Sequence, residues 1–171
     1  MGEDNELLEL CDLCPDILQE GFSAHRTGLT TSSSTQIDDW VVTSPYFSNT
    51  NFNVLSGVYT APVTGVYSVK ATISFTASAI SVSLGSSIYP FFVVKKVPPG
   101  TTVYVSGLLP VVNLSLVVTV RGVLGAGTVT LSGVVELTGG DEVGLFYDDN
   151  GMTSSITISD AFWTLYRINA G

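Results

Sequence analysis

From Gly21 onward, hydrophobic and polar residues alternate along the chain in short runs. The clearest run covers residues 65–78. One set of alternate positions holds Val66, Ser68, Lys70 and Thr72, and the other holds Tyr67, Val69, Ala71, Ile73 and Phe75. Successive side chains of a strand point to opposite faces, so this pattern predicts a half-buried β-strand. About ten such runs, separated by turn residues and not by helical patterns, predict an antiparallel all-β sandwich or barrel.

Two other hydrophobic stretches carry weaker signals. Residues 37–42, IDDWVV, predict a further strand. Residues 108–120, LLPVVNLSLVVTV, are very apolar, but polar residues and Pro110 interrupt them. A membrane helix needs about 20 apolar residues, so we expect one or two deeply buried strands here. Residues 113–115, NLS, match a glycosylation acceptor, which we expect to be buried and unmodified because its flanks are apolar.

Charge divides the chain into two parts. The net charge is −9, but residues 1–20 hold seven acidic residues and no lysine or arginine. The remainder holds eight acidic and six basic residues, so it is nearly neutral. We therefore expect an acidic N-terminal arm at 1–20 and one β-domain at 21–171. No basic patch is present to neutralise phosphates, which argues against nucleic-acid binding.

Composition favours a folded domain that associates with others. Of the 171 residues, 45% are hydrophobic and 12% are charged, which is typical of a globular domain and not of a disordered chain. So large an apolar share suggests that some of it is buried between subunits. No secretory signal is visible in the acidic first residues, so the export route of a surface protein stays open.

Cys11 and Cys14 form a Cys-x-x-Cys pair in the acidic arm, which is either a short helix or unstructured. A redox motif needs a βαβ context that this sequence lacks. Zinc needs four ligands, and one chain offers two thiols and a distant His25. In an oligomer the thiols of several arms would meet. Free thiols, interchain disulfides and a shared zinc all remain open.

Four blocks of the sequence, in order, resemble the globular heads of the complement C1q family. GFSAHRTG at 21–28 resembles the opening of these heads, and VYTAPVTGVYSVKATI at 58–73 resembles the family signature. VVELTGGDEVGLFYDD at 134–149 and AFWTLYRI at 161–168 are similar to its last strands. Val69 and Ala71 stand where the family has aromatic residues, and Thr164 where it has glycine. The aliphatic middle of the chain resembles more closely the C-terminal heads of bacterial collagen-like spore-surface proteins.

This resemblance implies a ten-stranded antiparallel jelly-roll sandwich of the C1q and tumour necrosis factor (TNF) superfamily, assembled as a homotrimer. A jelly roll has two outer faces, and a hydrophobic chain can bury one of them against its neighbours. We expect six aromatic residues to lie in the core or the subunit interface: Tyr59, Tyr67, Phe75, Phe146, Phe162 and Tyr166.

The acidic loop after residue 147 is a candidate calcium site. Asp148, Asp149 and Asn150 supply the oxygen ligands that calcium prefers, and the resemblance implies a calcium ligand at Asp148. The same Asp-Asn-Gly sequence is also favourable turn chemistry, so a plain hairpin tip remains an alternative. Asp38 and Asp39 form a second acidic pair, which we expect to be solvated.

The residues point to binding and assembly rather than catalysis. His25 lies in an alternating strand, where a structural role is expected, and no nucleophile motif is present. We expect a non-enzymatic trimeric module that binds an unknown protein or glycan outside the cell or on a spore or cell surface. The alternatives are a purely structural coat component without a ligand, and a TNF-like receptor-binding ligand.

Overall fold

The computed structural model describes residues 20–77, 85–115 and 119–170, and all regular elements in these ranges are strands. They are β1 (Gly21–Thr31), β2 (Thr35–Gln36), β3 (Phe47–Ser48), β4 (Phe52–Asn53), β5 (Val58–Thr60), β6 (Gly65–Ala77), β7 (Phe91–Lys96), β8 (Val103–Leu108), β9 (Val111–Ser115), β10 (Thr119–Val123), β11 (Ala126–Leu137), β12 (Glu142–Asp148) and β13 (Ile156–Ala170). The predicted N-terminal arm, with Cys11 and Cys14, lies outside the described residues.

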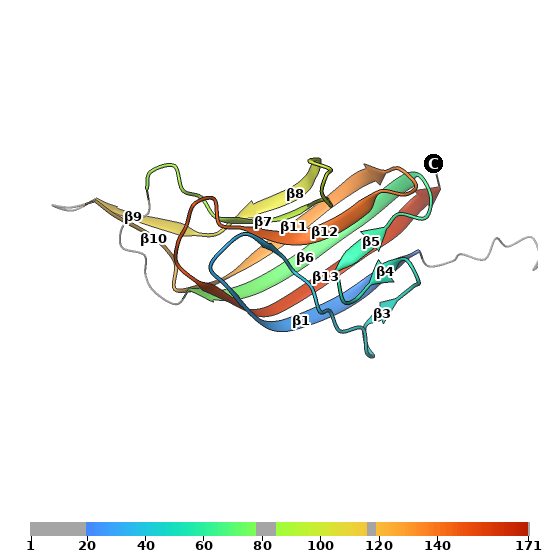
Figure 1. Ribbon diagram of the computed structural model, residues 1–171, viewed down its shortest axis with the longest axis horizontal. Helices are drawn as coiled ribbons and strands as arrows, with labels where there is room; N and C mark the ends of the chain where they lie inside the picture. The colour runs from blue at the N-terminus through green and yellow to red at the C-terminus, as the bar shows by residue number, and fades with distance from the viewer. Residues whose placement is uncertain (1–19, 78–84, 116–118, 171) are drawn as a thin grey trace, which may run out of the picture.

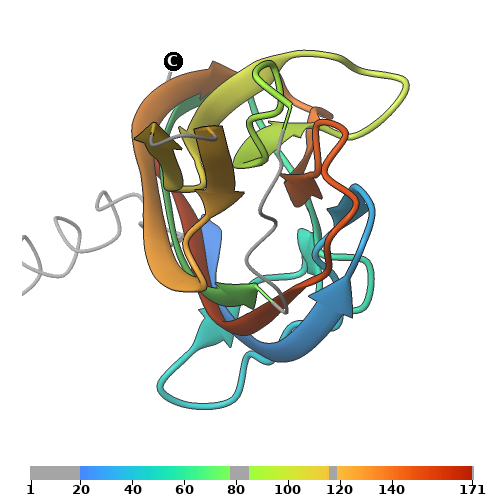
Figure 2. The same cartoon turned by 90° about the vertical axis from the view of Figure 1, so that its left-hand side faces the viewer.

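Two antiparallel sheets form the sandwich (Figure 1). The first, which we call sheet A, has the order β11-β6-β13-β1-β3. The second, sheet B, has the order β4-β5-β12-β7-β8, and β2 pairs with β12 beside it. Many neighbours come from distant parts of the chain, as in a jelly roll, for example β1 beside β13 and β6 beside β11. The view along the molecule shows the sheets as two curved layers (Figure 2).

The space between the sheets is filled by aromatic and aliphatic side chains. Trp163 on β13 is fully buried. Its ring lies 4.8 Å from the ring of Phe22 on β1 and 5.7 Å from that of Phe52 on β4, both edge to face. Offset and edge-on contacts of this kind add to the hydrophobic gain of burial. This cluster therefore ties the two sheets together.

The alternation at 65–78 correctly predicted strand β6 over its described residues. Tyr67, Val69, Ala71, Ile73 and Phe75 are buried, whereas Lys70 between them is exposed. β6 lies between β11 and β13, which pair with it over nearly its whole length. A central strand of a two-layer sandwich has one face on the core, so its sequence shows the clearest period of two.

The strand predicted at residues 37–42 is wrong. This segment is irregular, and its only bridge joins Val41 to His25 of β1. The Trp40 indole is buried and donates to the Ile37 carbonyl at 2.9 Å, while the Trp40 amide donates to Val54 at 2.8 Å. Ile37 and Trp40 are therefore buried at the edge of the core, although their segment does not extend a sheet.

The deep burial predicted for residues 108–120 holds for Leu109, which is 2% exposed in the core. It is wrong for most of the other residues of this segment whose side chains are described. β9 and β10 form a separate two-stranded sheet that projects from one end of the sandwich (Figure 1). Leu108 is 60% exposed, and Val112 and Asn113 are exposed too. At the base of this hairpin, the Arg121 guanidinium lies 4.2 Å from the centroid of the Tyr89 ring and donates to the Gly85 carbonyl.

Candidate functional site

Large hydrophobic side chains lie uncovered on the outer face of sheet A. Phe162 and Tyr166 on β13 are 40% and 46% exposed, and Val134 on β11 is 65% exposed. Phe47 on β3 is 44% exposed and pairs with Ser23, which lies on the same side of the sheet. We call these four residues the association face. An apolar strip along three strands of one sheet is typical of a surface that another protein covers.

A cluster of three rings extends the association face along β1. The centroid of the His25 ring lies 5.5 Å from that of Tyr46 and 4.6 Å from that of Phe162, and the Tyr46 and Phe162 centroids are 6.1 Å apart. Its Nε2 atom lies 3.2 Å from an Asp160 carboxylate oxygen. Because His25 and Phe162 are directly paired across β1 and β13, the sheet register places their rings together. The structural role expected for His25 agrees with this geometry.

Hydroxyl-bearing residues occupy much of the same face on β6 and β11, where Lys70 and Glu136 are also exposed. Ser74 and Thr128, on the neighbouring strands β6 and β11, are joined by a hydrogen bond of 3.0 Å between their hydroxyls. Thr72 and Thr130 form the next outward-facing pair along the same two strands, and their hydroxyl oxygens are 3.5 Å apart. Such short side chains leave the backbone accessible, so another subunit can approach this half of the sheet closely. The face as a whole combines aromatic knobs with a shallow hydroxyl-lined surface.

The acidic loop after β12 is tied to the loop that carries Ser34. Asp149 accepts hydrogen bonds from the Ser34 amide at 2.6 Å and from the Gly151 amide at 2.7 Å. The bond from Gly151, helped by the bonds from Ser34, holds the pKa of Asp149 below its usual value. Asp148 accepts from the Asn150 amide at 2.9 Å. Asn150 and Gly151 have positive φ, which asparagine and glycine tolerate, so the loop is a true turn.

These three predicted calcium ligands are consecutive and lie close together, but much of their hydrogen-bonding capacity is used within the turn. The Asn150 amide nitrogen donates to the Ser87 and Tyr89 carbonyl oxygens, each at 3.4 Å. Within the described ranges, three or more His, Cys, Asp or Glu side chains do not gather at one point. Calcium binding by Asp148, Asp149 and Asn150 therefore stays a prediction.

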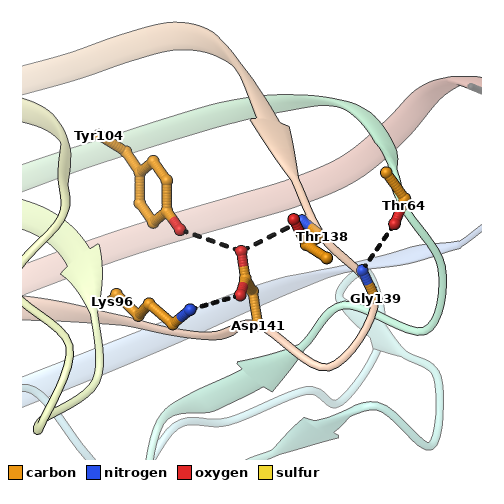
Figure 3. A network of polar contacts seen from close by, with 6 residues as sticks. All are labelled: Thr64, Lys96, Tyr104, Thr138, Gly139 and Asp141. Carbon is orange, nitrogen blue, oxygen red and sulfur yellow. Dashed lines mark hydrogen bonds and ion pairs between the residues drawn. The ribbon is translucent and has the colours of Figure 1, made fainter.

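A polar network fixes the turn between β11 and β12 (Figure 3). Lys96 Nζ on β7 donates to Asp141 Oδ1 at 2.6 Å, and the Thr138 amide donates to Asp141 Oδ2 at 3.1 Å. The hydrogen bond from Lys96 lowers the pKa of the Asp141 carboxyl and raises that of the lysine. The Gly139 amide donates to the Thr64 hydroxyl at 3.0 Å. This turn is thus held by Lys96 of β7 and by Thr64 in the connection between β5 and β6.

The six predicted aromatic residues divide into three groups by position. Tyr59, Tyr67 and Phe75 point into the sandwich and are at most 1% exposed. Phe146 is 8% exposed on the outer face of sheet B, where the Lys95 ammonium lies 4.6 Å from its ring centroid. Phe162 and Tyr166 are on the association face. Sequence reasoning missed Val134 and Phe47 there, although the register of β11 against β6 assigns Val134 to the outer side.

No family model matches this sequence. An uncharacterized protein of Acanthamoeba polyphaga mimivirus is 28% identical over 145 residues, or 75% of this chain. The chain spans about half (54%) of the length of that relative. Among solved structures, the Eiger TNF of S. frugiperda matches with a TM-score of 0.54 and 14% identity, covering 90% of this chain and 96% of that one. This likeness confirms the predicted TNF- and C1q-like jelly-roll fold. In the described part of the chain, no helix is long and apolar enough to span a bilayer.

Proposed function

We propose that this chain is a non-enzymatic jelly-roll module that assembles as a homotrimer through the association face and binds a ligand with its remaining surface. The observation that carries the proposal is the uncovered strip of Phe162, Tyr166 and Val134 on sheet A. Full burial of an exposed side chain of this kind contributes about 1.5–3 kcal/mol, and covering these two rings, which are 40% and 46% exposed, adds somewhat less than half of that for each. A monomer that left the strip in water would forgo this gain.

A second copy of the same chain is the partner that fits the face best. Outside the N-terminal arm, the chain holds eight acidic and six basic residues, so two copies meet without strong repulsion. The aromatic residues of the face lie on β13 and β3, and the hydroxyl-bearing residues lie on β6 and β11 beside Val134 and Lys70. Cyclic assembly lets the protruding part of one copy meet the shallow part of the next. The likeness to a TNF fold supports a closed ring of three subunits.

The ligand and the location belong to the same proposal. A trimer presents three identical ligand sites, which turns weak single contacts into useful avidity. We infer a protein or glycan ligand outside the cell, or on a cell, spore or particle surface. A receptor-binding ligand in the manner of TNF is a second candidate, favoured by the likeness to the Eiger structure. A coat component without a ligand is the third.

The test is the solution mass, measured by light scattering under reducing conditions with and without a calcium chelator. We expect a trimer in both conditions. Replacing both Phe162 and Tyr166 by aspartate should yield a folded monomer, because two charges per subunit would be desolvated in the interface. Leu55, which is 72% exposed in the turn after β4, offers the matched control, and Leu55→Asp should remain trimeric. A wild-type monomer, or a double variant that stays trimeric, would overturn the proposed assembly.

A further inference from the structure

A polar groove lies on sheet B, on the outer side of β4, β5 and β12. Its volume is about 450 Å³, within the range of about 300–1,000 Å³ usual for small-ligand sites. Six polar residues and one aliphatic residue line it, namely Thr50, Asn51, Asn53, Ser56, Thr60, Glu142 and Val58. The association face belongs to the other sheet, so the groove is a separate surface.

The floor of the groove is fixed by the core beneath it. Phe52, Tyr59 and Val143 are paired across β4, β5 and β12, and all three are buried. The alternate residues of the same strands therefore point outward into the groove. The turn above is closed by Asn53, whose side-chain oxygen accepts from the amides of Leu55 at 3.0 Å and Ser56 at 3.2 Å. The lining is thus largely organised before any ligand arrives.

Glu142 directly follows Asp141, the residue at the centre of the polar network in Figure 3. The Asp141 carbonyl accepts from the Ala61 amide, and the Glu142 carbonyl accepts from the Val97 amide, both at 2.8 Å. These bonds fix the backbone on both sides of the first residue of β12. Glu142 is exposed, and it belongs to none of the ion pairs found among the described residues. Its carboxylate is available to a ligand.

We propose that this groove binds a neutral oligosaccharide. Each sugar hydroxyl both donates and accepts hydrogen bonds, and the lining offers matching groups of both kinds. The Glu142 carboxylate accepts from two neighbouring hydroxyls, the Asn53 amide nitrogen donates, and the Thr60 hydroxyl does either. Bonds to the carboxylate are charge-assisted and therefore the strongest of the set.

The same lining disfavours other ligand classes. None of the lining residues is cationic, and Glu142 repels anions, so sulfated or sialylated glycans and phosphates fit poorly. The nearest outward cation on β7, Lys95, is directed over the Phe146 ring. Val58 is the sole aliphatic residue of the lining and no aromatic residue contributes, so a peptide finds no pocket for an apolar anchor.

Lack of an aromatic platform also makes each single site weak. The inference rests on the proposed trimer, because three grooves on one assembly convert weak binding to measurable retention on a glycan-coated surface. It adds to the proposed function the class of ligand and the residues that recognise it. Glu142 and Thr60 are the recognising residues, and Asp141 is a positioning residue.

The experiment is binding of the full chain to immobilised oligosaccharides, comparing neutral ones with sialylated and sulfated ones. We expect retention on at least one neutral oligosaccharide, with at least a tenfold loss in Glu142→Gln and in Thr60→Val. Both changes keep the shape of an outward side chain, so folding is preserved. Ser56→Phe should block the groove without removing the carboxylate. Thr153 is an exposed threonine in the connection between β12 and β13, and Thr153→Val is the matched control that should bind as the wild type does.

The solution mass of each sample separates the two proposals. A trimer that binds none of the neutral oligosaccharides, prefers the anionic ones, or binds equally well in all variants would overturn the groove proposal alone. Binding by a monomer that Glu142→Gln abolishes would support the groove and overturn the assembly. A short peptide panel on the same surface provides one further check, because stronger retention on peptides than on oligosaccharides would also overturn the groove proposal.

Discussion

The outer faces of the two sheets differ in what they leave uncovered. On sheet A, Phe162 and Tyr166 stand in solvent on the middle strand of five. On sheet B, Phe146 is nearly covered, and the exposed positions beside it form a groove of carboxylate, amide and hydroxyl groups around Glu142. In both sheets the side chains alternate, and the inward ones are buried in the shared core. The core therefore constrains the inward residues, whereas the outward residues can differ between the two sheets.

The buried residues of the sandwich therefore indicate little about function, whereas the outward residues of each sheet indicate what that sheet can bind. An apolar face suits a permanent neighbour, because its gain comes from exclusion of water. A polar groove suits a soluble ligand, because its hydrogen bonds exchange with water at little cost when the ligand leaves. Variants that act on the shared core should impair both faces, and variants that act on one face should spare the other.

Trp163→Ala should have the largest effect and damage both faces together. The Trp163 side chain is fully buried between the sheets, and its removal leaves a cavity among Phe22, Phe52 and Trp40. We expect a loss of about 3–5 kcal/mol in the free energy of unfolding, measured by denaturant titration. Phe162→Ala, one residue earlier on β13 but outward, should cost far less in a monomeric background. Equal losses in the two variants would contradict the assignment of inner and outer faces.

Gly57→Ala should have the next largest effect and act mainly on the groove. Gly57 has a φ of +65°, and an added Cβ would lie 2.3 Å from the Ile37 carbonyl oxygen. The β4–β5 turn must therefore move, and with it Ser56. We expect a loss of more than about 1 kcal/mol in the free energy of unfolding, because the native backbone is incompatible with a side chain. The solution mass should not change.

Gly125→Ala is the control for this change. Gly125 lies before β11, and an added Cβ there meets nothing within 4 Å. Its effect on the free energy of unfolding should be within about 0.5 kcal/mol, as for ordinary surface changes. A Gly57 variant as stable as the Gly125 variant would show that the turn does not need the positive φ.

Asp141→Asn should have a moderate effect that depends on pH. The hydrogen bond from Lys96 lowers the pKa of Asp141, so the folded pKa lies below the unfolded one. A carboxylate of this kind stabilises the fold above its unfolded pKa, and the gain disappears as the pH falls through the folded pKa. We expect Asp141→Asn to cost about 1–2 kcal/mol at pH 7 and nothing in strong acid. The measurement is the melting temperature of the wild type and of Asp141→Asn at a series of pH values from about 2 to about 8, at constant ionic strength. A deficit that persists at the acid end would point to lost packing instead of lost charge.

The sequence predicted those parts of the fold in which local pattern and tertiary role agree. β6 is central in its sheet and faces the core on one side, so its alternation was unambiguous. The prediction of deep burial for residues 108–120 failed in part because an apolar run indicates burial but not which residues are buried. Val112, for example, lies exposed on the projecting hairpin. Trp40 misled in the opposite way, because a buried side chain in an irregular segment looks like part of a strand.

The candidate sites were harder to predict than the fold. Phe162 and Tyr166 were expected in the core or the interface, but the sequence did not separate these two environments. The groove left little local signal. Asn53 and Thr60 lie on one hairpin of β4 and β5, but Glu142 comes from a distant part of the chain and joins them only through the register of β5 and β12. Single polar residues on strands look the same whether they line a site or simply face water.

We expect calcium to have a small effect on the free energy of unfolding. It tests the Asp148–Asp149 loop, which belongs neither to the association face nor to the groove. Asp148 and Asp149 are consecutive, and Asp149 already accepts bonds from Ser34 and Gly151, so only part of a coordination shell is present. For the predicted calcium site we expect a dissociation constant of about 10⁻⁴–10⁻³ M, the range of weak extracellular modules. At a tenfold excess over that constant, the gain in the free energy of unfolding is about 1.4 kcal/mol.

The melting temperature with calcium, with magnesium and with a chelator measures this gain. We expect a small rise with calcium alone, and its loss in Asp148→Asn, which removes the charge but retains an oxygen that accepts the bond from the Asn150 amide. The solution mass should be the same in all three conditions, because the association face is apolar and lies on sheet A. An identical melting temperature in calcium and chelator would contradict the calcium prediction and leave the loop as a turn held by Ser34. A trimer that dissociated with chelator would instead place the metal at a subunit contact and weaken the case for the aromatic strip as the main source of assembly.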